Sequence, residues 1–151
     1  MRAVLLSIKP KYVERIFFSN KRYELRRQKP GFNGGTTILV YSTKPDRYII
    51  GHFKSVDVIE ETIKELWNKV EAYAGMNYQE YRNYFNGNKL AYAIKIAEPV
   101  LWGTQISLED IRCAYPGYNP PQTYHYLDRD HPVIKVIRQV GKENGGIPCI
   151  I

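Results

Sequence analysis

Runs of apolar residues, some alternating and some continuous, divide the chain into short predicted strands and helices. Segment 2–8 is rich in Val, Leu and Ile and predicts a first strand. Pro10 suits the first turn of a helix, and Tyr12, Val13, Ile16 and Phe17 follow at helical spacing. The pattern therefore predicts a strand followed directly by an amphipathic helix that ends near residues 19–20.

The next segment, 21–27, alternates with a period of two, as strands do. Strict alternation puts Lys21, Tyr23, Leu25 and Arg27 on one face, and Arg22, Glu24 and Arg26 on the other. The second face is entirely ionic, which indicates a strand that borders a groove.

Later segments repeat this mixture of strands and short helices. The remaining predicted strands are 36–42, which is apolar enough to be buried on both sides, then 47–59, 90–96 and a short edge strand at 100–102. Predicted helices are 62–70, 78–85, a capped segment from Ser107 and a final helix from His131; a Pro- and Tyr-rich loop at 116–121 precedes an aromatic segment at 122–127.

Strands interrupted by short helices predict a mixed α+β barrel rather than a parallel doubly wound sheet, because long crossover helices do not alternate with the strands. A length of 151 residues predicts a single domain over 1–151. Gly145 and Gly146 predict that about 15 residues at the C-terminus form a frayed tail.

Composition and charge narrow the class of partner. The formal net charge is +7 and the pI about 9.4, which favours anionic partners such as nucleic acid. No apolar run reaches the roughly 18 residues of a membrane span, and no signal peptide is evident, so we expect a cytoplasmic protein that does not enter a membrane. The two cysteines, Cys113 and Cys149, lack metal-ligand spacing and fit a reduced compartment. A single disulfide between them is the alternative.

The strongest local charge signal lies between Lys21 and Lys29. Five cations crowd into nine residues there, with Glu24 as the single acid. Arg26 and Arg27 can grip a phosphate with two N–H groups, and Lys21 adds a point charge. Glu24 would accept hydrogen bonds from a base or sugar, or hold Arg26 in one rotamer. The alternative is a solvated strand edge, since charged residues also discourage edge-to-edge pairing.

Other candidate binding residues lie outside that cluster. Lys9 precedes the predicted helix N-terminus, where backbone N–H groups favour anions. Segment 41–44 offers a ring, two hydroxyls and a cation through Tyr41, Ser42, Thr43 and Lys44, although Tyr41 also suits a barrel core. A second wall would come from Gln122, Tyr124, His125 and Tyr126, in which the glutamine reads a base edge. No spacing of Cys, His and Asp indicates a metal site, and we expect no cofactor.

Six segments between roughly residues 4 and 127 carry a resemblance to a known family. They are Ser7-Ile8-Lys9-Pro10, Asn20-Lys21-Arg22-Tyr23-Glu24-Leu25-Arg26-Arg27, Tyr41-Ser42-Thr43-Lys44-Pro45, Ile50-Gly51-His52-Phe53, Ala91-Tyr92-Ala93-Ile94 and Pro120-Pro121-Gln122-Thr123-Tyr124-His125-Tyr126-Leu127. Taken in this order, they resemble the ASCH domain family. The resemblance implies a PUA-like β-barrel with a lysine–glutamate–arginine set in a cleft beside the first helix. It also implies RNA binding or a coactivator-like role.

Some members of that family are ribonucleases, and small bacterial relatives hydrolyse acylated cytidine. The latter use a lysine, a threonine three residues on, and a distal glutamate. Lys21 matches the lysine, but Glu24 stands where the threonine would be. The distal glutamate aligns near Ala74, with Glu71 as the nearest substitute.

These observations predict an RNA- or nucleotide-binding module whose basic cleft lies beside the first helix. The alternative is a small hydrolase, either an amidohydrolase on an acylated nucleoside or a ribonuclease, with Lys21 and Glu24 as the acid–base pair. Neighbouring cations would lower the pKa of the lysine, as a base requires, while Glu24 would raise it. A third reading is a protein-interaction adaptor that uses the loop at 115–126. The oligomeric state is left open.

Overall fold

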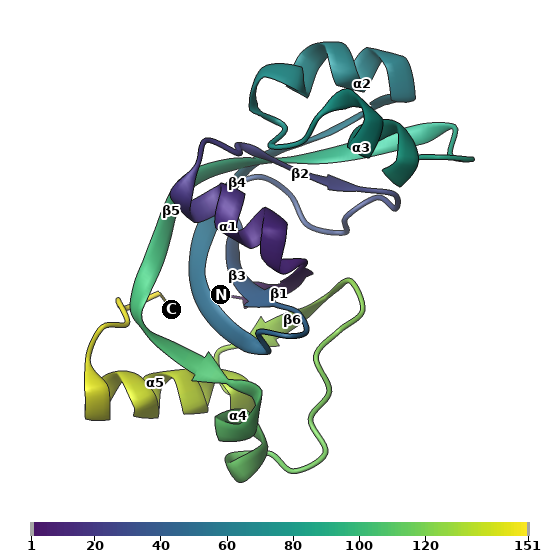
Figure 1. Ribbon diagram of the computed structural model, residues 1–151. Coiled ribbons are helices and arrows are strands. Elements are labelled where there is room, and N and C mark those ends of the chain that lie inside the picture. Colours follow the sequence, from purple (N-terminus) through teal and green to yellow (C-terminus); the bar gives the residue numbers. More distant parts are fainter. Residues whose placement is uncertain (1, 151) are drawn as a thin grey trace.

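The computed structural model describes residues 2–150 and contains one six-stranded sheet in the order β2-β5-β4-β3-β1-β6 (Figure 1). The strands are β1 (Arg2–Ile8), β2 (Tyr23–Arg26), β3 (Thr37–Ser42), β4 (Tyr48–Thr62), β5 (Leu90–Ser107) and β6 (Tyr124–Asp128). The helices are α1 (Pro10–Phe18), α2 (Ile63–Val70), the 3₁₀ turn η1 (Glu71–Tyr73), α3 (Tyr78–Tyr84), α4 (Leu108–Ala114) and α5 (Pro132–Asn144). The α+β class predicted from the sequence is confirmed.

Two long antiparallel strands, β4 and β5, extend from one end of the molecule to the other and bend strongly (Figure 1). Their pairing shifts register in three places, and such bulges bend strands. Gly51 lies at one of these bulges. The position favours glycine, because a Cβ there would stand 2.3 Å from the Val100 carbonyl oxygen and 2.9 Å from the Phe17 ring.

Three apolar clusters stabilise this sheet. One lies between the sheet and helices α4 and α5, and a second packs α1 against β1, β3 and β4. The third joins α2 and α3 to β2 and the adjoining end of β5, so these helices form a small lobe at one end of the sheet (Figure 1). β1 pairs in parallel with β3 and antiparallel with β6, which brings segment 122–127 beside the end of β1.

Several sequence-based predictions differ from this structure. Over residues 2–150 the sheet is open, with β2 and β6 at its two edges, so the predicted barrel is not closed. β5 continues through Glu98 and Pro99, where the sequence predicted a break; Glu98 absorbs the bend with a φ of 50°. Of the predicted tail, residues 137–144 belong to α5, whereas 145–150 form no helix or strand, although Ile147 and Ile150 pack against the cluster beside α5.

Among residues 2–150, no helix combines the length and the hydropathy that a membrane crossing requires.

Candidate functional site

A cavity of about 860 Å³ opens beside α1, between β2 and the segment that leads into β6. We call it the cleft. Its cationic lining residues are Lys9, Arg26, Arg27 and Lys29; its aromatic ones are Tyr12, Phe32, Tyr84, Tyr124 and Tyr126; and its other polar ones include Ser7, Glu24, Gln122, Thr123 and His125.

The end of β1 anchors two walls of the cleft. Ser7 Oγ donates to the Pro121 carbonyl at 2.7 Å, and Ser7 N–H donates to the Thr123 carbonyl at 3.0 Å. The Ser7 carbonyl in turn accepts from Arg26 Nη2 at 2.8 Å. The loop before β6 and strand β2 therefore meet at one residue, shortly before Pro10 begins α1.

Glu24 and Arg26 form the charged floor of the cleft, as expected for side chains on one face of a strand. Arg26 Nη2 lies 2.9 Å from Glu24 Oε2, and both side chains are largely buried. Arg26 Nε has no hydrogen-bond partner among the described residues although it is buried. Since Nη2 is occupied by Glu24 and Ser7, Nη1 is the part of this guanidinium that can meet a ligand.

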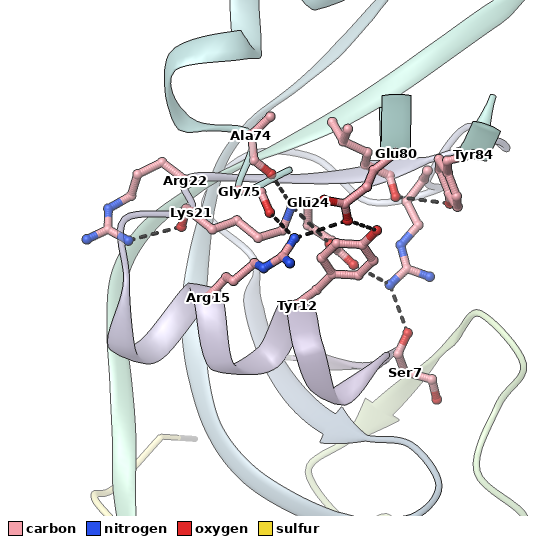
Figure 2. Close-up of polar contacts among 12 residues, drawn as sticks. Ser7, Tyr12, Arg15, Lys21, Arg22, Glu24, Ala74, Gly75, Glu80 and Tyr84 are labelled. Carbon is pink, nitrogen blue, oxygen red and sulfur yellow. Dashed lines mark hydrogen bonds and ion pairs between the residues drawn. The ribbon is translucent and has the colours of Figure 1, made fainter. Parts of the chain in front are cut away.

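Lys21 lies below this floor and not in the cleft. It is fully buried; its Nζ donates to the Ala74 carbonyl at 2.5 Å and lies 3.8 Å from Glu24 Oε1 (Figure 2). Burial lowers the pKa of Lys21; Glu24 opposes this, while Arg15 and Arg26 add to it. The resemblance leads one to expect a glutamate near Ala74. In this chain, Lys21 is instead bound by the backbone carbonyl of Ala74.

A second ion-pair group joins α1 to the lobe of α2 and α3. Arg15 Nη1 donates to the Gly75 carbonyl at 2.7 Å and to Glu80 Oε2 at 3.2 Å, and Tyr12 OH reaches the same oxygen at 3.4 Å (Figure 2). Glu80 also closes the capping box that begins α3. Burial alone would raise the pKa of Glu80, but hydrogen bonds from Arg15 and the Asn77 backbone hold it below its usual value.

The aromatic walls of the cleft are held by backbone contacts. Tyr84 OH donates to the Leu25 carbonyl at 3.1 Å, and the Arg27 guanidinium lies 4.6 Å from the centre of the Tyr84 ring. Across the cleft, Tyr124 OH accepts from Gly31 N–H at 2.8 Å and Tyr126 OH donates to the Gly31 carbonyl at 2.8 Å. These rings are fixed in place and half-buried, as stacking platforms need to be.

His125 lines the cleft, and both of its ring nitrogens have partners. Its Nδ1 lies 3.1 Å from the Tyr126 carbonyl, which can only accept, so Nδ1 carries the proton. Its Nε2 pairs with Tyr118 OH at 2.7 Å. Burial raises the pKa of Tyr118, which keeps this hydroxyl protonated.

The structure brings six of the ten predicted site residues together and separates four. Lys9, Glu24, Arg26, Arg27, Gln122 and Tyr124 line the cleft. Lys21 is buried beneath it, Tyr41 lies in the core under α4 and α5, and Ser42 donates to Asp46 at 2.7 Å within a turn. Lys44 is exposed in that turn but is not part of the lining, to which only the neighbouring Thr43 contributes.

Tyr12 and Tyr84 are lining residues that the sequence did not single out as binding residues. Tyr84 lies on α3, about 60 residues from Arg27 along the chain, and its helical spacing with Tyr81 indicated packing. Among residues 2–150, no group of three or more His, Cys, Asp or Glu side chains is placed to hold a metal ion together.

Comparisons with known proteins agree on the fold. The chain is 24% identical over 131 residues to a Zymomonas mobilis protein named ASCH domain-containing ribonuclease, and the match spans 85% of this chain and 86% of that protein. The crystal structure of ASCH from Zymomonas mobilis superposes with a TM-score of 0.82 at 21% identity, covering 97% of this chain and 98% of the other. A mutant form of that protein gives the same TM-score at 23% identity, covering 90% and 96%.

This likeness confirms the mixed α+β fold, with the sheet open as described above. The family model for the ASCH domain matches residues 6–100, which include the end of β1, all of α1 and β2, and the floor of the cleft. The chain therefore belongs to the ASCH domain family.

Proposed function

We propose that the chain binds single-stranded RNA in the cleft. The observation that carries this proposal is that exposed cations and half-buried rings line one cavity, with Arg27 over Tyr84 on one side and Tyr124 on the other. Single-stranded RNA is held by this combination, because bases stack on aromatic rings while phosphates meet Lys and Arg. A net charge of +7 adds a long-range attraction.

Each lining residue has a definite role in this proposal. Arg27, Lys29 and Lys9 are exposed and meet phosphates, and Arg26 contributes Nη1 from the floor. Tyr84 and Tyr124 stack on bases, and the amide of Gln122 pairs with a base edge. Glu24 holds Arg26 in one orientation and accepts hydrogen bonds from a base or ribose.

A salt series on short RNA, measured by fluorescence anisotropy, tests the proposal. Arg27→Ala is expected to weaken binding and to reduce the slope of log affinity against log salt by about 0.7, the value for one phosphate contact on a single strand. Lys135→Ala is the matched control, since Lys135 is an exposed cation on α5 outside the cleft lining. Equal affinities and slopes for wild type and Arg27→Ala would reject the cleft as the RNA site.

A second candidate function is RNA cleavage in the same cleft. The name of the Zymomonas mobilis relative favours it, and Glu24 is a carboxylate in the lining. In this reaction the ribose 2′-oxygen attacks the adjacent phosphorus, the bond to the 5′-oxygen breaks, and a 2′,3′-cyclic phosphate forms. Glu24 would take the 2′-hydroxyl proton. The leaving oxygen would gain its proton from water, because both ring nitrogens of His125 are occupied, by the Tyr126 carbonyl and by Tyr118 OH.

Lys21 has no contact with substrate in either candidate, because it is buried and held by Ala74. The predicted pairing of Lys21 with Glu24 as acid and base is therefore replaced by Glu24 alone. Glu24→Gln is expected to abolish formation of the cyclic phosphate from labelled RNA. Cleavage at the wild-type rate by this variant would exclude Glu24 as the base.

A further inference from the structure

A second cavity, of about 700 Å³, lies in the lobe formed by α2 and α3, between those two helices and the turn after α3. We call it the α2–α3 groove. Its aromatic lining residues are Trp67 and Tyr78, with the buried Tyr81 and Phe85 beneath them. Its polar lining includes Lys64, Asn68, Arg82, Asn86 and Asn88. Neither the family resemblance nor the cleft accounts for this composition.

Two aromatic residues of the groove, Trp67 and Tyr78, are more open than a core requires. Trp67 is half-buried, and its ring centre lies 5.4 Å from that of Tyr78 and 4.7 Å from that of Tyr81. The planes are inclined by 56° and 45°, so neither partner stacks flat on the indole. Tyr78 keeps 50% of its surface exposed. Such rings provide a surface on which a planar ligand can stack.

The polar lining suits a nucleobase with its phosphate. Asn68, Asn86 and Asn88 each carry an amide, which offers both a donor and an acceptor to a base edge. Lys64 and Arg82 are exposed cations on the two helices, and Glu71 is the one acid in the lining. Arg82 stays beside the platform because its Nη1 donates to Tyr78 OH at 3.3 Å.

Helix α3 connects the groove with the cleft. Tyr84 points from α3 into the cleft and meets Arg27, whereas Tyr78 and Arg82 on the same helix line the groove. A strand that leaves the cleft past Arg27 and Tyr84 thus meets the helix that carries the second platform. In Figure 1, α3 lies between α2 and β2, the strand that supplies the floor of the cleft.

We infer that the α2–α3 groove is a second nucleotide-binding site, which stacks a base of single-stranded RNA on Trp67 and Tyr78 and meets its phosphate with Arg82 and Lys64. The inference rests on the proposed function, since the strand in the groove is the continuation of the strand in the cleft. RNA long enough to reach both sites binds more tightly than RNA that fills the cleft alone.

The test compares RNAs of about four and about sixteen nucleotides by fluorescence anisotropy. Tyr78→Ala is expected to weaken the binding of the long RNA by roughly ten-fold, which corresponds to the loss of one stacked base. The affinity for the short RNA should not change. Tyr73→Ala is the matched control, because Tyr73 is 48% exposed in the same lobe but does not line the groove. Arg27→Ala is expected to weaken both RNAs.

The indole of Trp67 gives a second, direct readout. The long RNA is expected to quench the tryptophan fluorescence of wild type, and this quenching should disappear in Trp67→Phe, whose remaining tryptophan, Trp102, is buried in another cluster. Phenylalanine keeps an aromatic ring beside Tyr81, so this variant is expected to fold.

The outcomes separate the two proposals. If Arg27→Ala weakens the binding of both RNAs while Tyr78→Ala affects the binding of neither, the groove is not a nucleotide site and the cleft alone binds RNA. If Tyr78→Ala weakens the binding of the long RNA while Arg27→Ala changes neither affinity, the groove is a nucleotide site and the proposal that the cleft binds RNA fails. Quenching that persists in Trp67→Phe, or RNA that binds to neither site, would overturn the inference.

Discussion

Lys21 and Arg27 are cations six residues apart with opposite surroundings. Arg27 is exposed at the cleft, whereas Lys21 is fully buried beneath it. Alternation along 21–27 put both on one face, but β2 begins only at Tyr23, so the parity argument does not extend to Lys21. Alternation did place Glu24 and Arg26 together, because both lie within the strand. What the sequence lacks is the contact with Ala74, which is 53 positions away.

The buried Lys21 makes stability depend on alkaline pH. Its pKa is lowered by burial, so between that lowered pKa and 10.5 the unfolded chain binds more protons than the folded chain. The free energy of unfolding of wild type should therefore rise with pH through this window relative to Lys21→Met, as measured by urea unfolding. Arg22→Met is the control, since Arg22 is the neighbouring cation and is only half-buried. A difference between wild type and Lys21→Met that stays constant with pH would contradict the prediction.

At the scale of elements, long apolar or alternating segments were predicted well and bends were not. The strands at 2–8, 36–42 and 47–59 and the helices at 62–70 and 78–85 agree closely with β1, β3, β4, α2 and α3. Pro99 predicted the end of a strand, yet β5 continues to Ser107, because Pro99 lies at a bulge and beyond the residues of β5 that pair with β2. Whether the sheet closes into a barrel depends on how far β4 and β5 bend. The alternation of apolar and polar residues does not predict that bend.

Helix α5 depends on a titratable cap. His131 Nδ1 accepts from Val133 N–H at 3.1 Å, so the cap requires a neutral ring. Burial and the neighbouring His125 lower the pKa of His131, and Asp128 opposes them. The unfolded chain therefore binds more protons below pH 6.5, and stability present above that pH is lost as the pH falls toward the lowered pKa.

A capping residue that does not titrate should remove the pH dependence of stability while it still caps the helix. His131→Asn supplies an acceptor that does not titrate, so wild type should lose stability relative to this variant between about pH 7 and about pH 5. His131→Ala lacks an acceptor at every pH and should be about 1 kcal/mol less stable than wild type at alkaline pH. Thermal or urea unfolding across a pH series measures both differences. Parallel pH profiles for wild type and His131→Asn would show that the cap does not titrate.

At the scale of the whole molecule, β4 and β5 link the two ends that carry the separate clusters. Trp67 packs against the cluster of α2 and α3, while Trp102 lies in the cluster under α4 and α5, where its Nε1 donates to His52 Nδ1 at 2.9 Å. Both strands run through both ends and pair along most of their length, so we expect them to couple the unfolding of the two ends. The two tryptophans therefore report on one cooperative transition.

Single-tryptophan variants test this cooperativity. Trp102→Phe leaves the Trp67 signal and Trp67→Phe leaves the Trp102 signal, since the chain contains two tryptophans. In each variant, the urea midpoint from fluorescence is expected to coincide with the midpoint from far-UV circular dichroism of that same variant. A Trp67 transition at lower urea than the loss of sheet would mean that the lobe of α2 and α3 opens on its own. The α2–α3 groove would then be a site that forms and opens separately from the cleft.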